Sequence, residues 1–134
     1  HSPDSVENAL SFLQEIKKGR LIAIVGCGGD RDRTKRPKMA LVACQKADLA
    51  ILTSDNPRTE NPENILKDMC EGLNYTNYCV IVNRKEAIQK AISMAQAGDV
   101  IAVLGKGHED YQIIGTTKYH FSDKEEILKA IKGE

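Results

Sequence analysis

Apolar and polar positions along the chain follow two alternating patterns. Continuous apolar runs, bounded by glycine, charged or turn residues, predict strands that are buried on both faces. Four such runs lie at 21–25, 49–53, 78–82 and 100–104. Apolar residues at helical spacing predict helices at 4–17, 37–44, 62–73, 85–95 and 122–132. This alternation predicts an α/β fold of three layers, in which helices cover both faces of a mainly parallel, open sheet.

The end of the chain departs from the alternation. Two strand-like runs separated by Gly115 predict a β-hairpin near 111–121, at the edge of the sheet. Ser122, followed three residues later by Glu125, predicts a capping box at the start of the last helix. Because no repeat, low-complexity tract or linker interrupts the pattern, we expect residues 1–134 to form a single domain.

The composition narrows the class of protein. With 134 residues, 41% hydrophobic and 28% charged, the chain has the size and balance of one globular domain. Its 19 basic residues balance 19 acidic ones, which argues against a nucleic-acid partner. No apolar run approaches the ~20 residues of a membrane helix and no signal peptide is visible, so we expect no membrane partner and a cytoplasmic location. The cysteines and histidines lack metal-ligand spacing, so no metal site is expected.

Three polar loops, 26–36, 54–60 and 105–110, follow strands and should meet at the carboxyl edge of a parallel sheet, where ligands bind in open α/β folds. The first loop has neither the dinucleotide-binding fingerprint, because Arg31 stands where the third glycine belongs, nor a Walker sequence. It offers glycines for close approach and four basic side chains for anions. Those four are Arg31, Arg33, Lys35 and Arg36. The alternative is a solvated loop whose Asp30 and Asp32 pair with its own arginines.

The other two loops add groups of both charges. Arg58 is a candidate clamp for a carboxylate, and Asn56 can donate and accept a hydrogen bond. The alternative for Asp55 and Asn56 is an Asx turn that caps the next helix. In the third loop Glu109 suits an ammonium group, whereas His108 is more readily a structural or exposed histidine than a catalytic one. Guanidinium groups together with a carboxylate favour a polar amino acid as the ligand.

Three motifs resemble those of one family when they are taken together and in this order. They are Gly26-Cys-Gly-Gly-Asp-Arg-Asp, Asp55-Asn-Pro-Arg58 and Gly105-Lys-Gly-His-Glu-Asp-Tyr111. They resemble the C-terminal domain of the Mur ligases, and in particular of the members that add the third residue of the peptidoglycan stem peptide. The opening His1-Ser-Pro-Asp4 resembles part of the family's domain junction, so the resemblance covers essentially the whole chain.

The resemblance implies a Rossmann-like domain of a three-domain, ATP-dependent ligase. In that family ATP and Mg²⁺ convert the glutamate carboxylate of UDP-MurNAc-L-Ala-D-Glu to an acyl phosphate, which the amine of the incoming amino acid attacks. The missing central domain would bind ATP and Mg²⁺, so the resemblance implies no catalytic residue in this chain and no ligation by this chain alone. His1 resembles a residue that contacts the nucleotide. The residues implied to bind meso-diaminopimelate are Arg31, Asp55, Asn56, Arg58, Gly105 and Glu109.

Two other interpretations stay open at this point: a lysine-adding member of the family, and a stand-alone module that binds amino acids or anions without catalysis. Diaminopimelate has one carboxylate more than lysine, and the family's Asp-Asn-Pro-Arg motif is associated with diaminopimelate. Arg58 would lack its partner if lysine were bound, which favours diaminopimelate.

Overall fold

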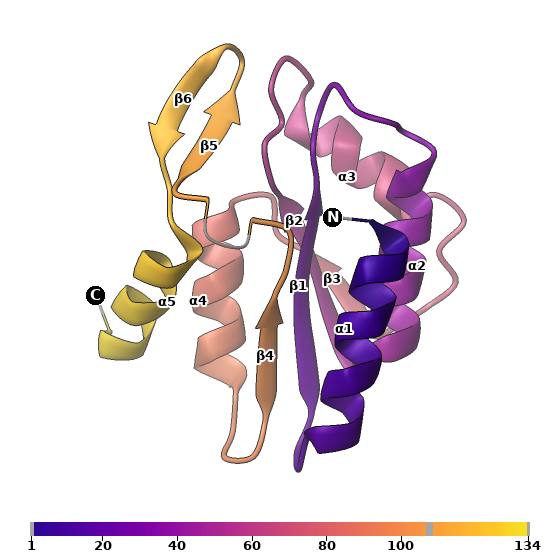
Figure 1. The fold of residues 1–134 in the computed structure, drawn as a ribbon, viewed down its shortest axis with the longest axis vertical. Helices are drawn as coiled ribbons and strands as arrows, with labels where there is room; N and C mark the ends of the chain where they lie inside the picture. The colour runs from indigo at the N-terminus through magenta and orange to yellow at the C-terminus, as the bar shows by residue number, and fades with distance from the viewer. Residues whose placement is uncertain (1, 107–108, 134) are drawn as a thin grey trace.

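A computed structural model describes residues 2–106 and 109–133, and four parallel strands form its central sheet (Figure 1). The strands are β1 (Leu21–Cys27), β2 (Leu49–Ser54), β3 (Tyr78–Val80) and β4 (Val100–Val103). Their order across the sheet is β3-β2-β1-β4. Each of the four predicted runs forms a strand, so the parallel sheet is confirmed.

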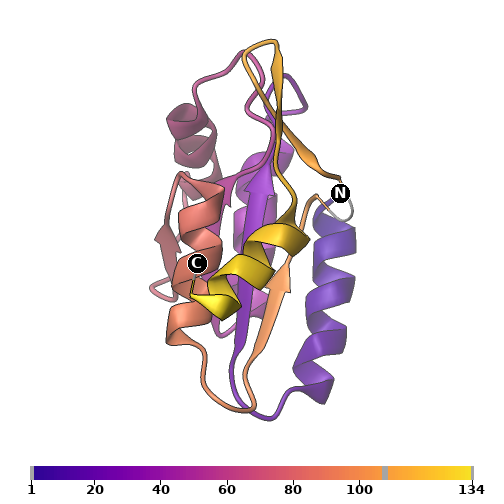
Figure 2. The ribbon, with the colours of Figure 1, turned by 90° about the vertical axis from the view of Figure 1, so that its left-hand side faces the viewer.

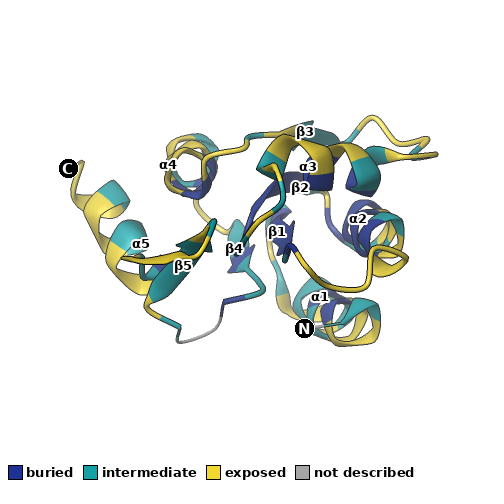
Figure 3. Ribbon diagram, turned by 90° about the horizontal axis from the view of Figure 1, so that it is seen from above, coloured by how far each residue is buried: buried dark blue, intermediate teal, exposed yellow. Residues whose placement is uncertain are grey.

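In the described ranges, five helices cover the two faces of this sheet. They are α1 (Pro3–Ile16), α2 (Lys35–Lys46), α3 (Pro62–Cys70), α4 (Arg84–Met94) and α5 (Asp123–Lys132). Helices α1, α2 and α3 pack on one face and α4 and α5 on the other (Figure 3). Strand β1 is buried throughout because its side chains alternate between two cores, with Leu21 and Val25 in one and Ile22 and Ile24 in the other. The predicted three-layer architecture is therefore confirmed.

Local sequence explains where several helices begin. Ser2, Asn61 and Asn83 each accept a hydrogen bond from a backbone N–H in the first turn that follows. Ser122 does the same for the amide of Glu125, as the capping box predicts. The Glu125 carboxylate, however, contacts His120 Nε2 at 2.6 Å, and no return bond to Ser122 is found among the described residues. One half of the predicted capping box is therefore present.

The predicted hairpin forms, but its predicted place at the edge of the sheet is wrong. Strands β5 (Tyr111–Ile114) and β6 (Thr117–His120) make a separate antiparallel sheet. The hairpin stands beyond the carboxyl ends of the central strands (Figures 1 and 2). There the loop after β2 forms hydrogen bonds with backbone groups of the hairpin. Arg58 N donates to Ile113 O at 2.9 Å, and Gly115 N donates to Arg58 O at 2.5 Å.

Element boundaries differ by a few residues from those expected. Helix α2 begins at Lys35 rather than at Pro37, which lies in its first turn, where a missing N–H costs nothing. Strand β3 ends at Val80 rather than at Val82, because the chain turns toward α4 there. Within residues 2–106 and 109–133, no helix is long and apolar enough to cross a membrane.

Candidate functional site

A pocket of about 400 Å³ opens at the carboxyl end of the sheet. The three polar loops after β1, β2 and β4 line it, which confirms that they converge. All six residues expected to bind an amino acid lie on its wall: Arg31, Asp55, Asn56, Arg58, Gly105 and Glu109. His1 and His108 lie outside the described residues, so the structure places neither of them.

Glycine allows the first two loops to touch. Gly29 N donates to Asn56 O at 2.7 Å, and a Cβ added to Gly29 would lie 1.8 Å from Pro57 O. No larger residue fits this approach without moving a backbone. Gly105, where the third loop leaves the sheet, has a φ of +113°, a conformation that favours glycine. The sequence thus has a glycine at both of these positions.

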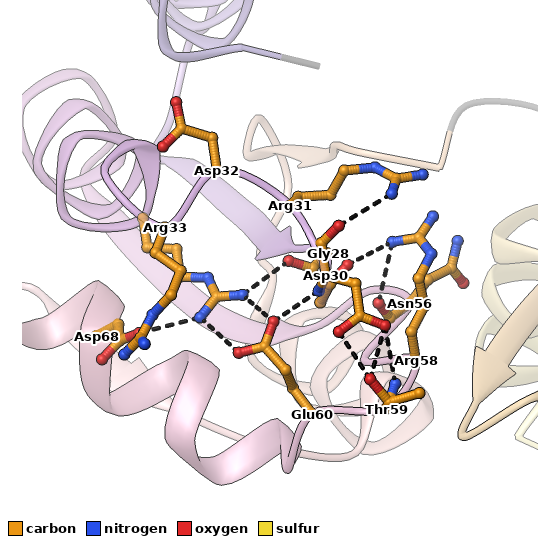
Figure 4. Close-up of polar contacts among 12 residues, drawn as sticks. Gly28, Asp30, Arg31, Asp32, Arg33, Asn56, Arg58, Thr59, Glu60 and Asp68 are labelled. Carbon is orange, nitrogen blue, oxygen red and sulfur yellow. Dashed lines mark hydrogen bonds and ion pairs between the residues drawn. The ribbon is translucent and has the colours of Figure 1, made fainter.

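The hairpin and the first loop together hold Arg58. Its φ of +53° is unusual for a residue with a side chain, and the two backbone hydrogen bonds to the hairpin maintain it. Its Nη1 donates to Gly29 O at 2.9 Å and lies 3.4 Å from Asn56 O (Figure 4). No carboxylate pairs with its guanidinium in the described part of the chain, so Arg58 presents an uncompensated cation to the pocket.

Arg31 is the second such cation. It is exposed, and its Nη1 donates to the carbonyl of Asp30 at 3.1 Å. The aspartates beside it have other partners: Asp30 accepts from Thr59 Oγ1 at 2.7 Å (Figure 4), and Asp32 accepts from Thr34 Oγ1 at 2.7 Å. The alternative in which Asp30 and Asp32 pair with the loop's own arginines is therefore wrong for the described contacts.

The expectation that Arg36 binds an external anion is also wrong. Its side chain is 1% exposed and pairs with Glu60 at 2.6 Å and Asp68 at 3.0 Å, while Nη2 donates to Gly28 O at 3.2 Å. Arg33 also pairs with Asp68, at 3.0 Å. The hydrogen bond from Arg36, with one from the Asp30 amide, lowers the pKa of Glu60 to about 2. The ion pairs of Arg33 and Arg36 hold the first loop in its conformation. Arg31 and Lys35 are therefore the cations of this loop that remain at the pocket for a ligand.

Lys106 is the important residue that sequence reasoning missed. Its side chain is fully buried, and its Nζ donates to Tyr111 O at 2.7 Å and to Asn56 Oδ1 at 3.0 Å. Asp55 Oδ1 lies 3.1 Å from the same ammonium, as a charge contact without the alignment of a hydrogen bond. The available sign of its importance in the sequence was its place between two glycines, in a loop that follows a strand. The buried cation ties the third loop to the second.

The remaining groups are acidic or neutral. Asp55 and Asn56 do not cap α3, because the Asn61 side chain does, so the Asx-turn alternative is wrong. Glu109 is half-buried, and its amide donates to Lys106 O at 3.0 Å. Burial raises the pKa of Cys27 to about 12, which keeps this thiol at the pocket neutral. Among the described residues, no three metal-binding side chains gather closely enough to hold an ion.

The pocket wall thus combines two arginines without carboxylate partners with a lysine, an amide and three carboxylates: Arg31, Arg58, Lys35, Asn56, Asp32, Asp55 and Glu109. Guanidinium groups bind carboxylates, and Asp or Glu binds an ammonium group. A zwitterionic amino acid matches this arrangement better than an apolar ligand does.

Known proteins are similar to this chain in sequence and in fold. The family model described as "Mur ligase, glutamate ligase domain" matches residues 1–107. The chain is 52% identical over 132 residues to a UDP-N-acetylmuramoyl-L-alanyl-D-glutamate--2,6-diaminopimelate ligase of Clostridium acetobutylicum, covering 98% of this chain and 27% of the relative. It is 56% identical over 133 residues to the ligase of the same name from Bacillus cereus, covering 99% of this chain and 27% of the relative. The chain thus spans about a quarter of the length of these relatives.

Solved structures agree with the sequence comparison. A structure of a UDP-N-acetylmuramoyl-L-alanyl-D-glutamate--2,6-diaminopimelate ligase superposes with a TM-score of 0.96 at 44% identity, covering 99% of this chain and 28% of that one. A folylpolyglutamate synthase from Thermotoga maritima shares the fold at 18% identity, with a TM-score of 0.51 over 76% of this chain and 23% of that one. The chain therefore belongs to the family of Mur ligase C-terminal domains.

Proposed function

We propose that this chain is the amino-acid-binding domain of an ATP-dependent ligase that adds meso-diaminopimelate to UDP-MurNAc-L-Ala-D-Glu in peptidoglycan synthesis. The observation that carries the proposal is the presence of Arg31 and Arg58 at one pocket, each without a carboxylate partner in the described chain. The names of the relatives, at 52% and 56% identity, support the same substrate.

Each pocket residue then has a role in binding. Arg58, with Asn56 and Gly105, holds the carboxylate of diaminopimelate that lysine lacks, and Glu109 with Asp55 holds the ammonium group beside it. Arg31 holds the other carboxylate, next to the amine that attacks the acyl phosphate. A bidentate guanidinium contact fixes direction as well as charge, so the attacking amine is oriented by the far end of its own molecule.

The other substrates are assigned to parts of the enzyme outside this chain. ATP and Mg²⁺ need a phosphate cradle and oxygen ligands, and neither a Walker sequence nor a described metal-binding cluster is present here. We therefore assign ATP and Mg²⁺, like UDP-MurNAc-dipeptide, mainly to the other domains. A nucleotide contact by His1 stays a prediction. We place the reaction in the cytoplasm, where the four free cysteines would stay reduced.

The test is ligation by the full-length protein that contains this chain. It is supplied with UDP-MurNAc-L-Ala-D-Glu, ATP and Mg²⁺, and with either meso-diaminopimelate or L-lysine, and phosphate release is measured. We expect kcat/KM for diaminopimelate to exceed that for lysine by at least ~100-fold, because a site built to bind a polar group of the substrate strongly rejects an analogue that lacks this group. Equal values, or a preference for lysine, would contradict the proposal.

A further inference from the structure

We propose that Lys106 is a positioning residue that fixes the side-chain amide of Asn56 with its NH₂ group toward the ligand. This inference rests on the proposed function and deepens it. It assigns a task to a buried lysine that sequence reasoning left without one. It also decides which chemical group of the amino acid lies beside Asn56.

The surroundings of Lys106 leave it no direct part in binding. Its side chain has no exposed surface, and its Nζ faces Tyr111 O at 2.7 Å, Asn56 Oδ1 at 3.0 Å and Asp55 Oδ1 at 3.1 Å. Two of these oxygens accept hydrogen bonds from the ammonium group, and the third, on Asp55, forms an ion pair with it. Because the ammonium group is buried among these three groups of the protein, it acts on a ligand through the groups that it holds.

The orientation of the Asn56 amide follows from the neighbours of Oδ1. Lys106 Nζ and Ile113 N both lie 3.0 Å from this atom, and both are groups that can only donate. An NH₂ group in the same place would face two donors without an acceptor. The oxygen must therefore point toward Lys106 and the hairpin, and Nδ2 must point the other way.

The pocket thus receives a donor from Asn56. Asn56 lines the pocket, and within the described chain no acceptor is found for its Nδ2. The ligand group beside Asn56 is consequently an acceptor, which in a zwitterionic amino acid is a carboxylate. Arg58 lies in the same loop and presents the same preference. The ammonium group is left to the carboxylates of Asp55 and Glu109.

A lysine suits this task better than a neutral donor would. Asp55 is 7% exposed, and a buried carboxylate beside the pocket needs a compensating charge. Lys106 supplies that charge across the 3.1 Å ion pair and orients Asn56 through a hydrogen bond. The same contact therefore keeps the second loop in place and keeps a donor, rather than an oxygen, at the ligand.

The experiment uses the full-length ligase and two variants, Lys106→Met and Asn56→Asp. Methionine has about the length of lysine but cannot donate, so we expect KM for the amino acid to rise ~10- to 100-fold while KM for ATP stays within ~3-fold. Asn56→Asp keeps an oxygen toward Lys106 and Ile113 N but replaces the donor at the ligand by a second oxygen. We expect an unchanged or higher Tm together with a rise in KM for the amino acid of at least ~100-fold.

Asp99→Asn is the matched structural control. Asp99 lies at the opposite end of the sheet, where it accepts from Arg20 N at 2.7 Å and Gln96 N at 2.9 Å. We expect this variant to lower Tm without changing KM for the amino acid. If Lys106→Met lowers Tm by as much and also leaves that KM unchanged, Lys106 is merely structural and the inference fails.

Asn56→Asp provides the second way to overturn the inference. An unchanged or lower KM would mean that an oxygen of Asn56 already faces the ligand. Both variants are assayed with the amino acid that the wild-type enzyme accepts, since every such substrate carries a carboxylate. A wild-type preference for lysine therefore refutes the proposed function, whereas indifference of KM to both variants refutes the role of Lys106.

Discussion

Arg58 donates from Nη1 to the backbone carbonyl of Gly29 at 2.9 Å, although the two residues belong to loops that follow different strands. The bond anchors one corner of the guanidinium group. Its other nitrogens have no partner in the described residues, and they lie at the wall of the pocket. A ligand carboxylate would meet a guanidinium group whose position is already set, so binding would cost little side-chain conformational entropy.

Removing the guanidinium group should therefore affect one substrate more than the other. In the full-length ligase, we expect Arg58→Ala to lower kcat/KM for meso-diaminopimelate ~10- to 100-fold, because a charge-assisted bond contributes ~1.5–3 kcal/mol. Lysine should lose much less, since it has no carboxylate at that end. Arg58→Lys should recover part of the loss, because a single point charge cannot form two parallel bonds. Steady-state kinetics with both amino acids measure these ratios.

A melting curve is the control for that prediction. A role of Arg58 in supporting the loop by pairing with Asp55 or Glu60 does not match the structure, because those carboxylates pair with Lys106 and Arg36. Equal fractional losses for both amino acids, together with a lower Tm, would nonetheless show that Arg58 supports the loop and does not select the substrate.

Two neighbouring glycines should behave differently when each is changed to alanine. A Cβ on Gly28 would lie 2.8 Å from Arg58 Nη1, the far end of a long side chain that can shift, whereas a Cβ on Gly29 would lie 1.8 Å from the backbone oxygen of Pro57. We expect Gly28→Ala to keep Tm within a few degrees but raise KM for diaminopimelate. We expect Gly29→Ala to cost ~1–3 kcal/mol of unfolding free energy, as overpacking does. Similar melting curves for the two variants would contradict this reasoning.

Acid should destabilise the chain partly through Glu60. The folded state holds the pKa of this carboxyl at about 2, below its ordinary value of 4.5, because Arg36 and the Asp30 amide donate to it. The unfolded chain therefore binds the proton more readily, so the stabilisation is complete above pH 4.5 and is lost as the pH falls toward 2. We expect Glu60→Gln to be less stable than wild type at pH 7 and to lose less stability than wild type over this interval.

Urea unfolding of both proteins at a series of pH values checks this prediction. Glu126→Gln is a suitable control, because its 3.8 Å contact with Lys129 joins neighbouring turns of one helix. Parallel stability curves for wild type and Glu60→Gln between pH 4.5 and 2 would show that Glu60 does not contribute.

The thiol at the pocket should be unreactive in the folded chain. A pKa of about 12 leaves on the order of one Cys27 thiol in 10,000 ionised at pH 8, and the thiolate is the nucleophile. We expect iodoacetamide to leave Cys27 unmodified in native protein and to modify all four cysteines in urea, as read by peptide mass mapping. Rapid native modification of Cys27 would mean that the loops around it open readily.

The buried pair of Arg84 and Asp123 should be important for stability. Arg84 Nε and Nη2 each donate to Asp123 at 2.7 Å, and the arginine also donates to Ser54 O and Leu104 O. We expect Arg84→Met to cost ~3–5 kcal/mol, because it leaves a buried carboxylate without its cation. Adding Asp123→Leu to that variant should restore part of the loss, as urea unfolding of the single and double variants would show. A double variant less stable than Arg84→Met would contradict this prediction.

The sheet could be predicted from the sequence because each strand is buried on both faces and therefore appears as an uninterrupted apolar run. The convergence of the three polar loops could be predicted because parallel strands bring their following loops to one edge, whereas the set of six residues at the pocket was implied by the resemblance to the Mur ligases. The position of the hairpin could not, since it depends on backbone bonds between Arg58 and residues more than fifty positions away. Hydrogen bonds between backbone groups cannot be inferred from the pattern of apolar and polar side chains along the sequence.

The buried cations were equally hidden. Arg36 and Lys106 stand in polar loops where exposure is the usual state of a basic residue. Their partners lie at a distance along the chain, Glu60 and Asp68 for the first and Asn56 for the second. Apart from the glycines on either side of Lys106, nothing in the local sequence separates these cations from Arg31 or Lys35, which stay exposed.

This division among residues of like charge has an evolutionary consequence. Arg36 and Lys106 are buried, and their carboxylate partners belong to this chain, whereas Arg31 and Arg58 contact only backbone carbonyls within the described residues. A mutation that replaced Arg58 would leave the hydrogen bond from Gly29 N to Asn56 O and the ion pairs of Arg36 in place. Substrate preference can thus diverge between lineages by single substitutions at the pocket wall, while selection on folding continues to preserve the interior.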